Sequence, residues 1–221
     1  MVERKGYTLI ELVVAMGVLA ILSIALFEAF DFGSRSFREA NTRQNAQGAL
    51  TRAYSVLRGE LRRSHFRSIS VVERATIVEE EEVRRDALSL GGVKDWHDPE
   101  SYDELNGVPK WNRFIIFYGT MDGKLVRSTV DLENGDPSPV PFYDLDGERY
   151  LKDDPSTNTG YQTSYRVISE SLREFECTLY PGTDTVRVEC ALEIDRRGRE
   201  KGLSQFEIEV FPQNTWPKGD S

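Results

Sequence analysis

Two residue types on which metal-dependent and nucleophilic enzymes rely, cysteine and histidine, are scarce in this sequence. Its 221 residues include two cysteines, Cys177 and Cys190, and two histidines, His65 and His97. Two cysteines are too few for a disulfide scaffold or a structural zinc site, and two histidines leave little material for a catalytic triad. The P-loop, G-x-S-x-G, H-E-x-x-H and dinucleotide-binding motifs are also missing. We therefore expect no catalytic residues and no enzymatic activity.

An excess of positive charge is missing as well. The chain has 28 Lys and Arg against 37 Asp and Glu, which gives a formal net charge of −9. Binding to nucleic acid requires basic side chains that neutralise phosphates, so this balance argues against a nucleic-acid partner. The hydrophobic fraction of 39% with 10% aromatic residues is typical of a globular protein, and the length allows one ordinary domain plus an appendage.

Proline is absent before Pro99, which allows a long helix near the N-terminus. Apolar residues share one helical face from Leu50 through Ala53, Tyr54 and Leu57 to Leu61. We expect this helix to end near His65 to Ser68, and His65 to be a surface or packing residue. Five arginines lie mostly off the apolar face. They form either a solvated surface or a contact to lipid phosphates or an acidic partner: Arg52, Arg58, Arg62, Arg63 and Arg67.

The N-terminal segment is the most informative part of the sequence. After Arg4 and Lys5 the chain is apolar from Tyr7 to Phe27. At 1.5 Å per residue, about 21 helical residues span a hydrocarbon core of about 30 Å. The positive-inside rule places the Arg4 and Lys5 side in the cytoplasm. We therefore expect a single-pass protein of the inner membrane, with residues 28–67 continuing the helix outside the cytoplasm.

A secretory signal peptide is the simpler interpretation of such a segment. Two features oppose it. No small-x-small cleavage site stands out directly after Phe27. Glu11 lies inside the apolar run, where a carboxylate costs about 2.5–3.5 kcal/mol near the bilayer centre and somewhat less near its edge. An ionisable residue in this position is a candidate functional residue.

The sequence Lys5-Gly6-Tyr7-Thr8-Leu9-Ile10-Glu11, followed by an apolar helix, resembles the class III signal of type IV pilins and type II secretion pseudopilins. The resemblance implies that a prepilin peptidase removes residues 1–6, cutting after Gly6, and methylates the new N-terminus at Tyr7. Most members of the family begin with Phe, so Tyr7 is a departure that keeps the aromatic ring. The resemblance also implies that residues 7–27 form the filament core and that Glu11 pairs with the Tyr7 amine of a neighbouring subunit, which sets the axial step.

Beyond the helix, short apolar runs separated by turn residues predict strands. We expect an α+β fold in which the long N-terminal helix packs on antiparallel β-sheet, pilin-like, with residues 68–221 as one β-rich globular domain. Residues 131–164 are rich in Asp, Pro, Gly and Asn and predict an exposed loop. The expected strands are residues 70–72, 75–78, 113–118 paired with 124–130, the hairpin 172–180 with 185–194, and 205–211, in which Phe206, Ile208 and Val210 point inward.

The two cysteines lie on the two arms of the predicted hairpin. With Thr183 and Asp184 at its tip, Cys177 and Cys190 are directly opposite, close enough for a disulfide bond. Outside the cytoplasmic membrane such a bond is chemically allowed. The alternative is a pair of buried thiols in the core of a sheet.

The acidic stretch after Tyr143 is the best candidate metal site. Asp144 and Asp146 lead it, with Glu148, Asp153 and Asp154 following. Calcium takes several oxygen ligands from one loop, and some major pseudopilins hold calcium in a late loop. The acidic series of an EF-hand is incomplete here, and acidic loops are usually solvated. We therefore expect no cofactor, with calcium as the one weak candidate.

A second resemblance concerns residues 167–176, Val-Ile-Ser-Glu-Ser-Leu-Arg-Glu-Phe-Glu, which are similar to the late segment of J-type minor pseudopilins. This implies a structural subunit of the periplasmic pseudopilus of a type II secretion system. Its partners would be the prepilin peptidase, other minor and major pseudopilins and inner-membrane lipid. A minor pilin of a type IV pilus, acting in adhesion, motility or DNA uptake, is the alternative. The missing motifs disfavour an enzyme or ligand-binding domain carried on a pilin-type anchor.

Overall fold

A computed structural model describes residues 8–105, 107–136, 138–143, 145–160, 162–194 and 202–214. The chain divides into two compact units, residues 1–44 and 45–221, and the boundary falls within helix α1, Leu9–Arg63. The described part of the first unit is entirely helical after Thr8. Its apolar side chains from Leu9 to Phe27 are all exposed.

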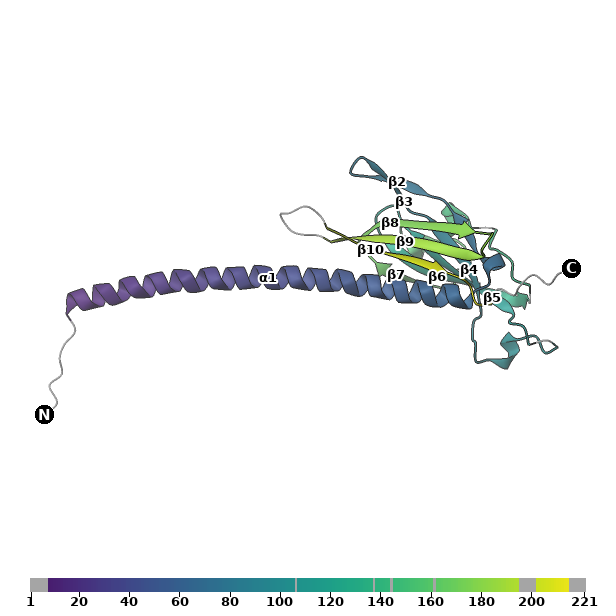
Figure 1. The fold of residues 1–221 in the computed structure, drawn as a ribbon, viewed down its shortest axis with the longest axis horizontal. Helices are drawn as coiled ribbons and strands as arrows, with labels where there is room; N and C mark the ends of the chain where they lie inside the picture. The colour runs from purple at the N-terminus through teal and green to yellow at the C-terminus, as the bar shows by residue number, and fades with distance from the viewer. Residues whose placement is uncertain are drawn as a thin grey trace. The chain divides into compact units, whose positions relative to one another are not determined.

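The described residues of the second unit form the end of α1, three antiparallel sheets and four short helices (Figure 1). The first sheet has the order β1-β4-β5-β6-β7, the second β10-β9-β8, and β2 and β3 form a separate hairpin. The elements are β1 Ser70–Val72, β2 Ala75–Val78, β3 Glu81–Arg84, β4 Ala87–Gly92, β5 Trp111–Gly119, β6 Leu125–Asp136, β7 Ser164–Ser169, β8 Leu172–Tyr180, β9 Thr185–Ile194 and β10 Gly202–Val210, with η1 Phe66–Ser68, η2 Pro99–Ser101, α2 Gly147–Tyr150 and η3 Pro155–Thr157.

The end of α1 packs against both larger sheets and forms the main core. Ala53, Leu57 and Leu61 are completely buried, and Leu50 is nearly so, which confirms the predicted apolar stripe. Replacing Leu57 or Leu61 by Ala would lower the free energy of unfolding by about 2–5 kcal/mol. Their neighbours in this core come from both sheets: Leu88, Leu90, Ile115, Phe117 and Leu125 from the first, and Phe175, Val186, Val188, Leu192, Ile208 and Val210 from the second. The predicted α+β fold, a long helix packed on antiparallel sheet, is therefore confirmed.

Helix α1 ends at Arg63, earlier than predicted. Ser64 donates its hydroxyl to the Leu61 carbonyl at 2.7 Å, and His65 has an extended backbone, with φ −112° and ψ 135°. The His65 ring then caps η1 by accepting the Arg67 N–H at 3.0 Å. Because the side chains of Ser64 and His65 satisfy local backbone groups, the chain turns away from the helix at this point. Helical continuation through residue 67 is therefore wrong.

The strongest strand predictions are confirmed. Strands β8 and β9 have the predicted ends, and β5 pairs with β6 across a turn in which Gly123 has φ +95°. In β10, Ile208 and Val210 are buried and Phe206 is half-buried, while the residues between them are exposed. Each of these segments has either alternating apolar and polar residues or many β-branched and aromatic residues. Clear turn residues mark their ends.

Strand β4 was not predicted, although it lies between β1 and β5 and is buried throughout. Its sequence, Ala-Leu-Ser-Leu-Gly-Gly, contains no β-branched or aromatic residue and ends in two glycines, so it has little strand propensity. Close packing favours glycine at position 91, because a Cβ atom there would lie 2.8 Å from Ser68 Cβ.

The prediction of an exposed loop over residues 131–164 is wrong. Strand β6 continues to Asp136, and four apolar side chains cover the face of the five-stranded sheet opposite α1: Phe142, Leu145, Tyr150 and Leu151. Tyr150 and Leu151 are buried in this second core, and Tyr118 donates its hydroxyl to the Lys152 carbonyl at 3.2 Å. The polar composition of this stretch concealed a few large apolar side chains that pack on the sheet.

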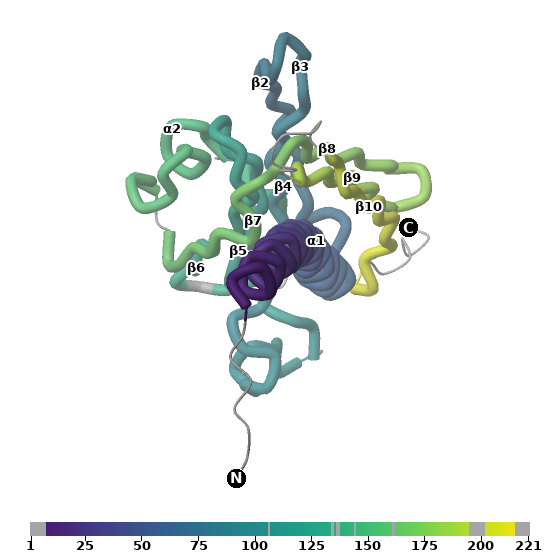
Figure 2. The backbone as a smooth tube through the Cα atoms, turned by 90° about the vertical axis from the view of Figure 1, so that its left-hand side faces the viewer, coloured from purple at the N-terminus to yellow at the C-terminus, as the bar shows by residue number. Residues whose placement is uncertain are grey.

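A buried carboxylate holds the β2–β3 hairpin to the second sheet. Asp86 is completely buried and accepts four hydrogen bonds: from the Arg74 N–H at 3.1 Å, from two Arg84 nitrogens at 3.0 Å each, and from the Cys177 N–H at 3.0 Å. Figure 2 shows the hairpin projecting from the rest of the unit. Asp86 therefore fixes the base of this projection, while Arg173 on β8 holds its tip through ion pairs with Glu79 at 3.4 Å and Glu81 at 2.7 Å.

Candidate processing and assembly segment

The first turn of α1 is closed by a reciprocal pair of side chains, Thr8 and Glu11. Glu11 Oε2 accepts the Thr8 backbone N–H at 2.9 Å and the Thr8 hydroxyl at 3.1 Å, and the Glu11 N–H points back to Thr8 Oγ1 at 3.4 Å. Thr8 directly precedes the first helical residue and Glu11 is the third residue of the helix, so the two form a capping box. An anionic group in the first turn also interacts favourably with the helix dipole.

The structure thus gives Glu11 a local role that the sequence argument missed. The sequence does contain the pattern of a capping box, which is Thr-x-x-Glu before an apolar run. The carboxylate remains exposed at the start of the helix, where a further partner can reach it. Gly6 and Tyr7, the predicted cleavage and methylation residues, lie outside the described residues.

The helix that follows Glu11 is suited to a membrane. Among the described helices, α1 is the one long and apolar enough to span a bilayer, with a mean hydropathy of 2.7 in its most apolar window and none of that window buried. Ser23, the one polar side chain in the apolar run after Glu11, donates its hydroxyl to the Leu19 carbonyl at 2.8 Å. A hydroxyl bonded in this way needs no external partner in lipid.

The apolar run ends at a charged turn of the helix. Arg35 and Asp31 form an ion pair at 2.6 Å with both side chains well exposed. An exposed pair of this spacing contributes about 0.3–0.5 kcal/mol. The described residues from 31 to 44 are mostly exposed, so this segment of the helix depends on its own backbone hydrogen bonds and on side-chain pairs.

The two cysteines are free and buried, and the predicted register between them is wrong. Cys177 lies opposite Val188, and Cys190 lies opposite Phe175. The loop Pro181–Asp184 has four residues, which shifts the centre of the hairpin one residue towards the N-terminus from the predicted tip. The thiols are diagonal neighbours, a relationship that usually separates Cα atoms by about 7–8 Å and is too long for a disulfide without backbone movement.

Burial also makes both thiols unreactive. It raises the pKa of the Cys177 thiol well above its usual value, with the nearby Asp86 carboxylate adding to the effect. Burial raises the pKa of the Cys190 thiol to about 12. Because the thiolate is the nucleophilic form, neither residue is poised for redox or covalent chemistry.

The acidic residues considered for calcium have other contacts. Asp146 caps α2 by accepting the Glu148 N–H at 3.0 Å, Asp154 caps η3 through the Ser156 N–H at 3.0 Å, and Asp153 accepts the Met121 N–H at 2.6 Å. Asp144 lies outside the described residues. Within the ranges that the structure describes, no three or more His, Cys, Asp or Glu side chains gather in a way that could hold a metal ion.

The arginines near the end of α1 do not act as one cluster. Arg58 donates to the Tyr54 hydroxyl at 3.1 Å and lies over its ring, whereas Arg62, Arg63 and Arg67 are exposed. Arg52 instead lines a groove beneath the helix, together with Val56, Glu60, Arg127, Arg166 and Ile168.

His65 has the packing role expected for it. The residue is 8% exposed, and its ring caps η1 and lies edge-on to Trp111 with the ring centroids 6.3 Å apart. Burial is the main cause that lowers the pKa of His65. The lowered pKa favours the neutral imidazole, whose unprotonated Nδ1 can accept the Arg67 N–H at the cap.

Comparison with known protein families gives a match at the N-terminus. A family model described as the prokaryotic N-terminal methylation motif matches residues 1–27. Searches of curated proteins and of solved structures find no match. The matched segment includes Gly6, Glu11 and the apolar part of α1. The motif therefore supports a prepilin-like protein, a structural subunit with a class III signal that is processed by a prepilin peptidase, anchored by one membrane-spanning helix and assembled with other pilins.

Proposed function

We propose that this protein is a minor pseudopilin, a structural subunit of the periplasmic pseudopilus of a type II secretion system. One observation carries the proposal: the helix segment from Leu9 to Phe27 exposes every apolar side chain, and its one ionisable side chain is Glu11. Such a surface requires lipid or neighbouring helices to cover it. A helix that passes from the membrane into a filament core meets both conditions.

The proposed processing creates a partner for Glu11. Cleavage after Gly6 leaves a positively charged amine on Tyr7, which the peptidase then methylates. The capping box uses Oε2 of Glu11, and a carboxylate has about four acceptor sites, so the same group can also accept an amine from a neighbouring subunit. Pairing the two charges offsets the free energy of burying each of them in an apolar filament core. The contact would also fix the axial position of one subunit against the next.

Orientation and subtype rest on further features of the sequence. Arg4 and Lys5 favour a cytoplasmic N-terminus, and this supports a periplasmic location for residues 45–221. Residues 167–176, which resemble J-type minor pseudopilins, join β7 of the first sheet to β8 of the second. Glu11 argues against a K-type tip pseudopilin, a class that typically lacks this glutamate.

The test is in-cell crosslinking of the tagged full-length protein in its native membrane, with partners identified by mass spectrometry. Crosslinks to other minor pseudopilins and to inner-membrane secretion components are the expected result. Crosslinks to a major pilin and its retraction machinery would assign the protein to a type IV pilus instead. A complete lack of pilin-like partners would refute assembly into a filament.

A further inference from the structure

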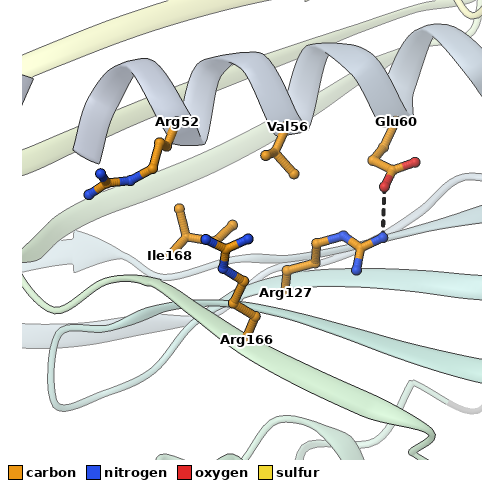
Figure 3. A pocket seen from close by; sticks show the side chains of 6 residues that line it. All are labelled: Arg52, Val56, Glu60, Arg127, Arg166 and Ile168. Carbon is orange, nitrogen blue, oxygen red and sulfur yellow. Dashed lines mark hydrogen bonds and ion pairs between the residues drawn. The ribbon is translucent and has the colours of Figure 1, made fainter. Parts of the chain in front are cut away.

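A groove in the second unit lies between the end of α1 and strands β6 and β7. Its volume is about 300 Å³, and Figure 3 shows its lining side chains. Val56 and Ile168 provide an apolar surface, and the four remaining side chains are charged: Arg52, Glu60, Arg127 and Arg166. The helix and the two strands are distant in sequence, so only the folded unit brings these residues together.

The groove contains an unfavourable pair of like charges. Arg127 on β6 and Arg166 on β7 are directly opposite in the antiparallel register and therefore point to the same face of the sheet. Like charges at directly opposite positions destabilise a sheet. Glu60 compensates one of them, accepting from Arg127 Nη2 at 2.7 Å with both side chains largely buried. Three guanidinium groups against one carboxylate leave the groove with a net charge of +2 (3 − 1).

Two of the arginines lack a partner in the part of the chain that the structure describes. Neither Arg52 nor Arg166 forms an ion pair or a side-chain hydrogen bond there, and both are exposed. The planar fork of an arginine binds a carboxylate in a bidentate manner, and apolar walls suit the methylene groups that carry it.

We propose that this groove binds an acidic segment of a neighbouring subunit. Arg166 and Arg52 bind its carboxylates, the Arg127–Glu60 pair fixes the floor, and Val56 and Ile168 contact the aliphatic parts of the incoming side chains. Strand β7 is at the edge of its sheet, so an extended segment can lie beside it. The inference rests on the proposed function only in naming the neighbour as a pilin-like subunit.

The test converts the contact into a covalent bond. In the full-length protein in its native membrane, Arg166→Lys keeps the charge and supplies an amine that a carbodiimide joins to any carboxylate in direct contact. Arg149→Lys, an equally exposed position on α2 outside the groove, is the matched control. We expect the amine introduced at position 166 to form a bond to Asp or Glu of a co-assembled pilin-like subunit, at least ten times more often than the control. Peptide mapping by mass spectrometry identifies the partner residue.

Two results would overturn the inference. These are a crosslinking yield equal to that of the Arg149→Lys control, and a bond formed only to Glu60 of the same chain. Charge reversal is the second measurement: Arg166→Glu should reduce recovery of the neighbouring subunit at least fivefold, and Arg149→Glu should not. If pilin-like subunits are recovered but the groove makes no bond to them, the inference fails and the proposed function stands. If no pilin-like subunit is recovered, the proposed function fails.

Discussion

Glu11 Oε2 lies 3.1 Å from the hydroxyl of Thr8 and 2.9 Å from its backbone nitrogen, so the carboxylate that we place in the filament interface is also a helix cap. The two roles make different demands. Capping requires an acceptor oxygen at this position, which glutamine supplies as well as glutamate. Pairing with the amine of another subunit requires the negative charge. Variants at this one position can therefore separate the local role from the assembly role.

We predict that Glu11→Ala leaves membrane insertion intact and strongly reduces incorporation into the filament. The apolar residues from Leu12 to Phe27 are unchanged, so the helix still partitions into the bilayer. Filament incorporation is measured as the fraction of protein in the sheared or detergent-resistant assembly, and membrane insertion as the carbonate-resistant fraction.

Glu11→Gln and Thr8→Ala are the matched controls for this prediction. Glu11→Gln keeps the cap and removes the charge, and it should fail in assembly as Glu11→Ala does. Thr8→Ala removes one side of the cap at a cost of about 1 kcal/mol of helix stability and should still assemble. Normal assembly of Glu11→Gln together with failure of Thr8→Ala would show that the cap matters and the charge does not.

Asp86→Ala should lower the free energy of unfolding of the globular unit by about 3 kcal/mol, because it removes a buried carboxylate and leaves its donors without an acceptor. The hairpin formed by β2 and β3 should loosen first, since Asp86 connects Arg84 at its base to Cys177 on β8. Urea unfolding of the full-length protein in detergent measures the change. Glu82→Ala, an exposed carboxylate on the same hairpin, is the control and should change stability by less than about 0.5 kcal/mol. Equal effects of the two variants would contradict this account of Asp86.

Cys177 and Cys190 should resist alkylation in the folded protein at pH 8 and react fully once it is unfolded without reductant. Burial protects both residues, and the raised thiol pKa values keep them protonated. Quantitative labelling with iodoacetamide, read by mass spectrometry before and after unfolding, measures this. A product that stays unlabelled until reductant is added would show that a disulfide forms and would reverse our conclusion.

The same thiols should make the protein less stable in alkaline solution. An exposed thiol in the unfolded chain loses its proton near pH 8.5, whereas folded Cys190 holds it to about 12. Above pH 8.5 the folded state therefore binds more protons than the unfolded state. As a result, the free energy of unfolding falls as the pH rises from there towards 12. Replacing both cysteines by alanine should flatten this decline in thermal unfolding measured between pH 8 and 11, and an unchanged slope would contradict the assignment.

Removal of divalent cations should leave the thermal midpoint of the globular unit unchanged within about 1 °C. Asp146 and Asp154 already accept backbone N–H groups as helix caps, so their contribution to the fold does not require a metal ion. Differential scanning calorimetry with EDTA and with millimolar calcium tests this expectation. A rise in the midpoint on calcium addition, lost in Asp146→Ala, would establish a calcium site.

The parts of the fold that the sequence predicted well are those in which local pattern and tertiary burial agree. The stripe from Leu50 to Leu61 has helical spacing and is buried on the same face. The β8–β9 hairpin has strong strand residues on both sides of Pro181 and Gly182. Strand β4 and the cover formed by Tyr150 and Leu151 were not predicted, because the five-stranded sheet imposes their burial and local pattern does not reveal it. Strand β4 is an inner strand of that sheet, and Tyr150 and Leu151 pack on its face.

The candidate sites also divide into those that a contiguous sequence segment reveals and those that depend on the tertiary structure. The processing segment is contiguous, so its resemblance to a class III signal identified Gly6 and Glu11 directly, whereas the capping role of Thr8 was visible as a Thr-x-x-Glu pattern but was not predicted. The register of Cys177 and Cys190 depended on a loop centre that turn residues fix only to within one position. The groove lined by Arg52, Arg127 and Arg166 lies between α1, β6 and β7. No local sequence pattern could predict that Arg52 and Arg166 line the same groove.

Mass spectrometry of the mature N-terminus tests the central claim most directly. The full-length protein is purified from membranes of a host that has its prepilin peptidase, and its N-terminal peptide is sequenced. Our account predicts a chain that begins at Tyr7 with a methylated amine, and a matched Gly6→Ala variant that keeps residues 1–6. A wild-type chain that retains Met1, or one cut beyond Phe27 as a secretory signal would be, would contradict it.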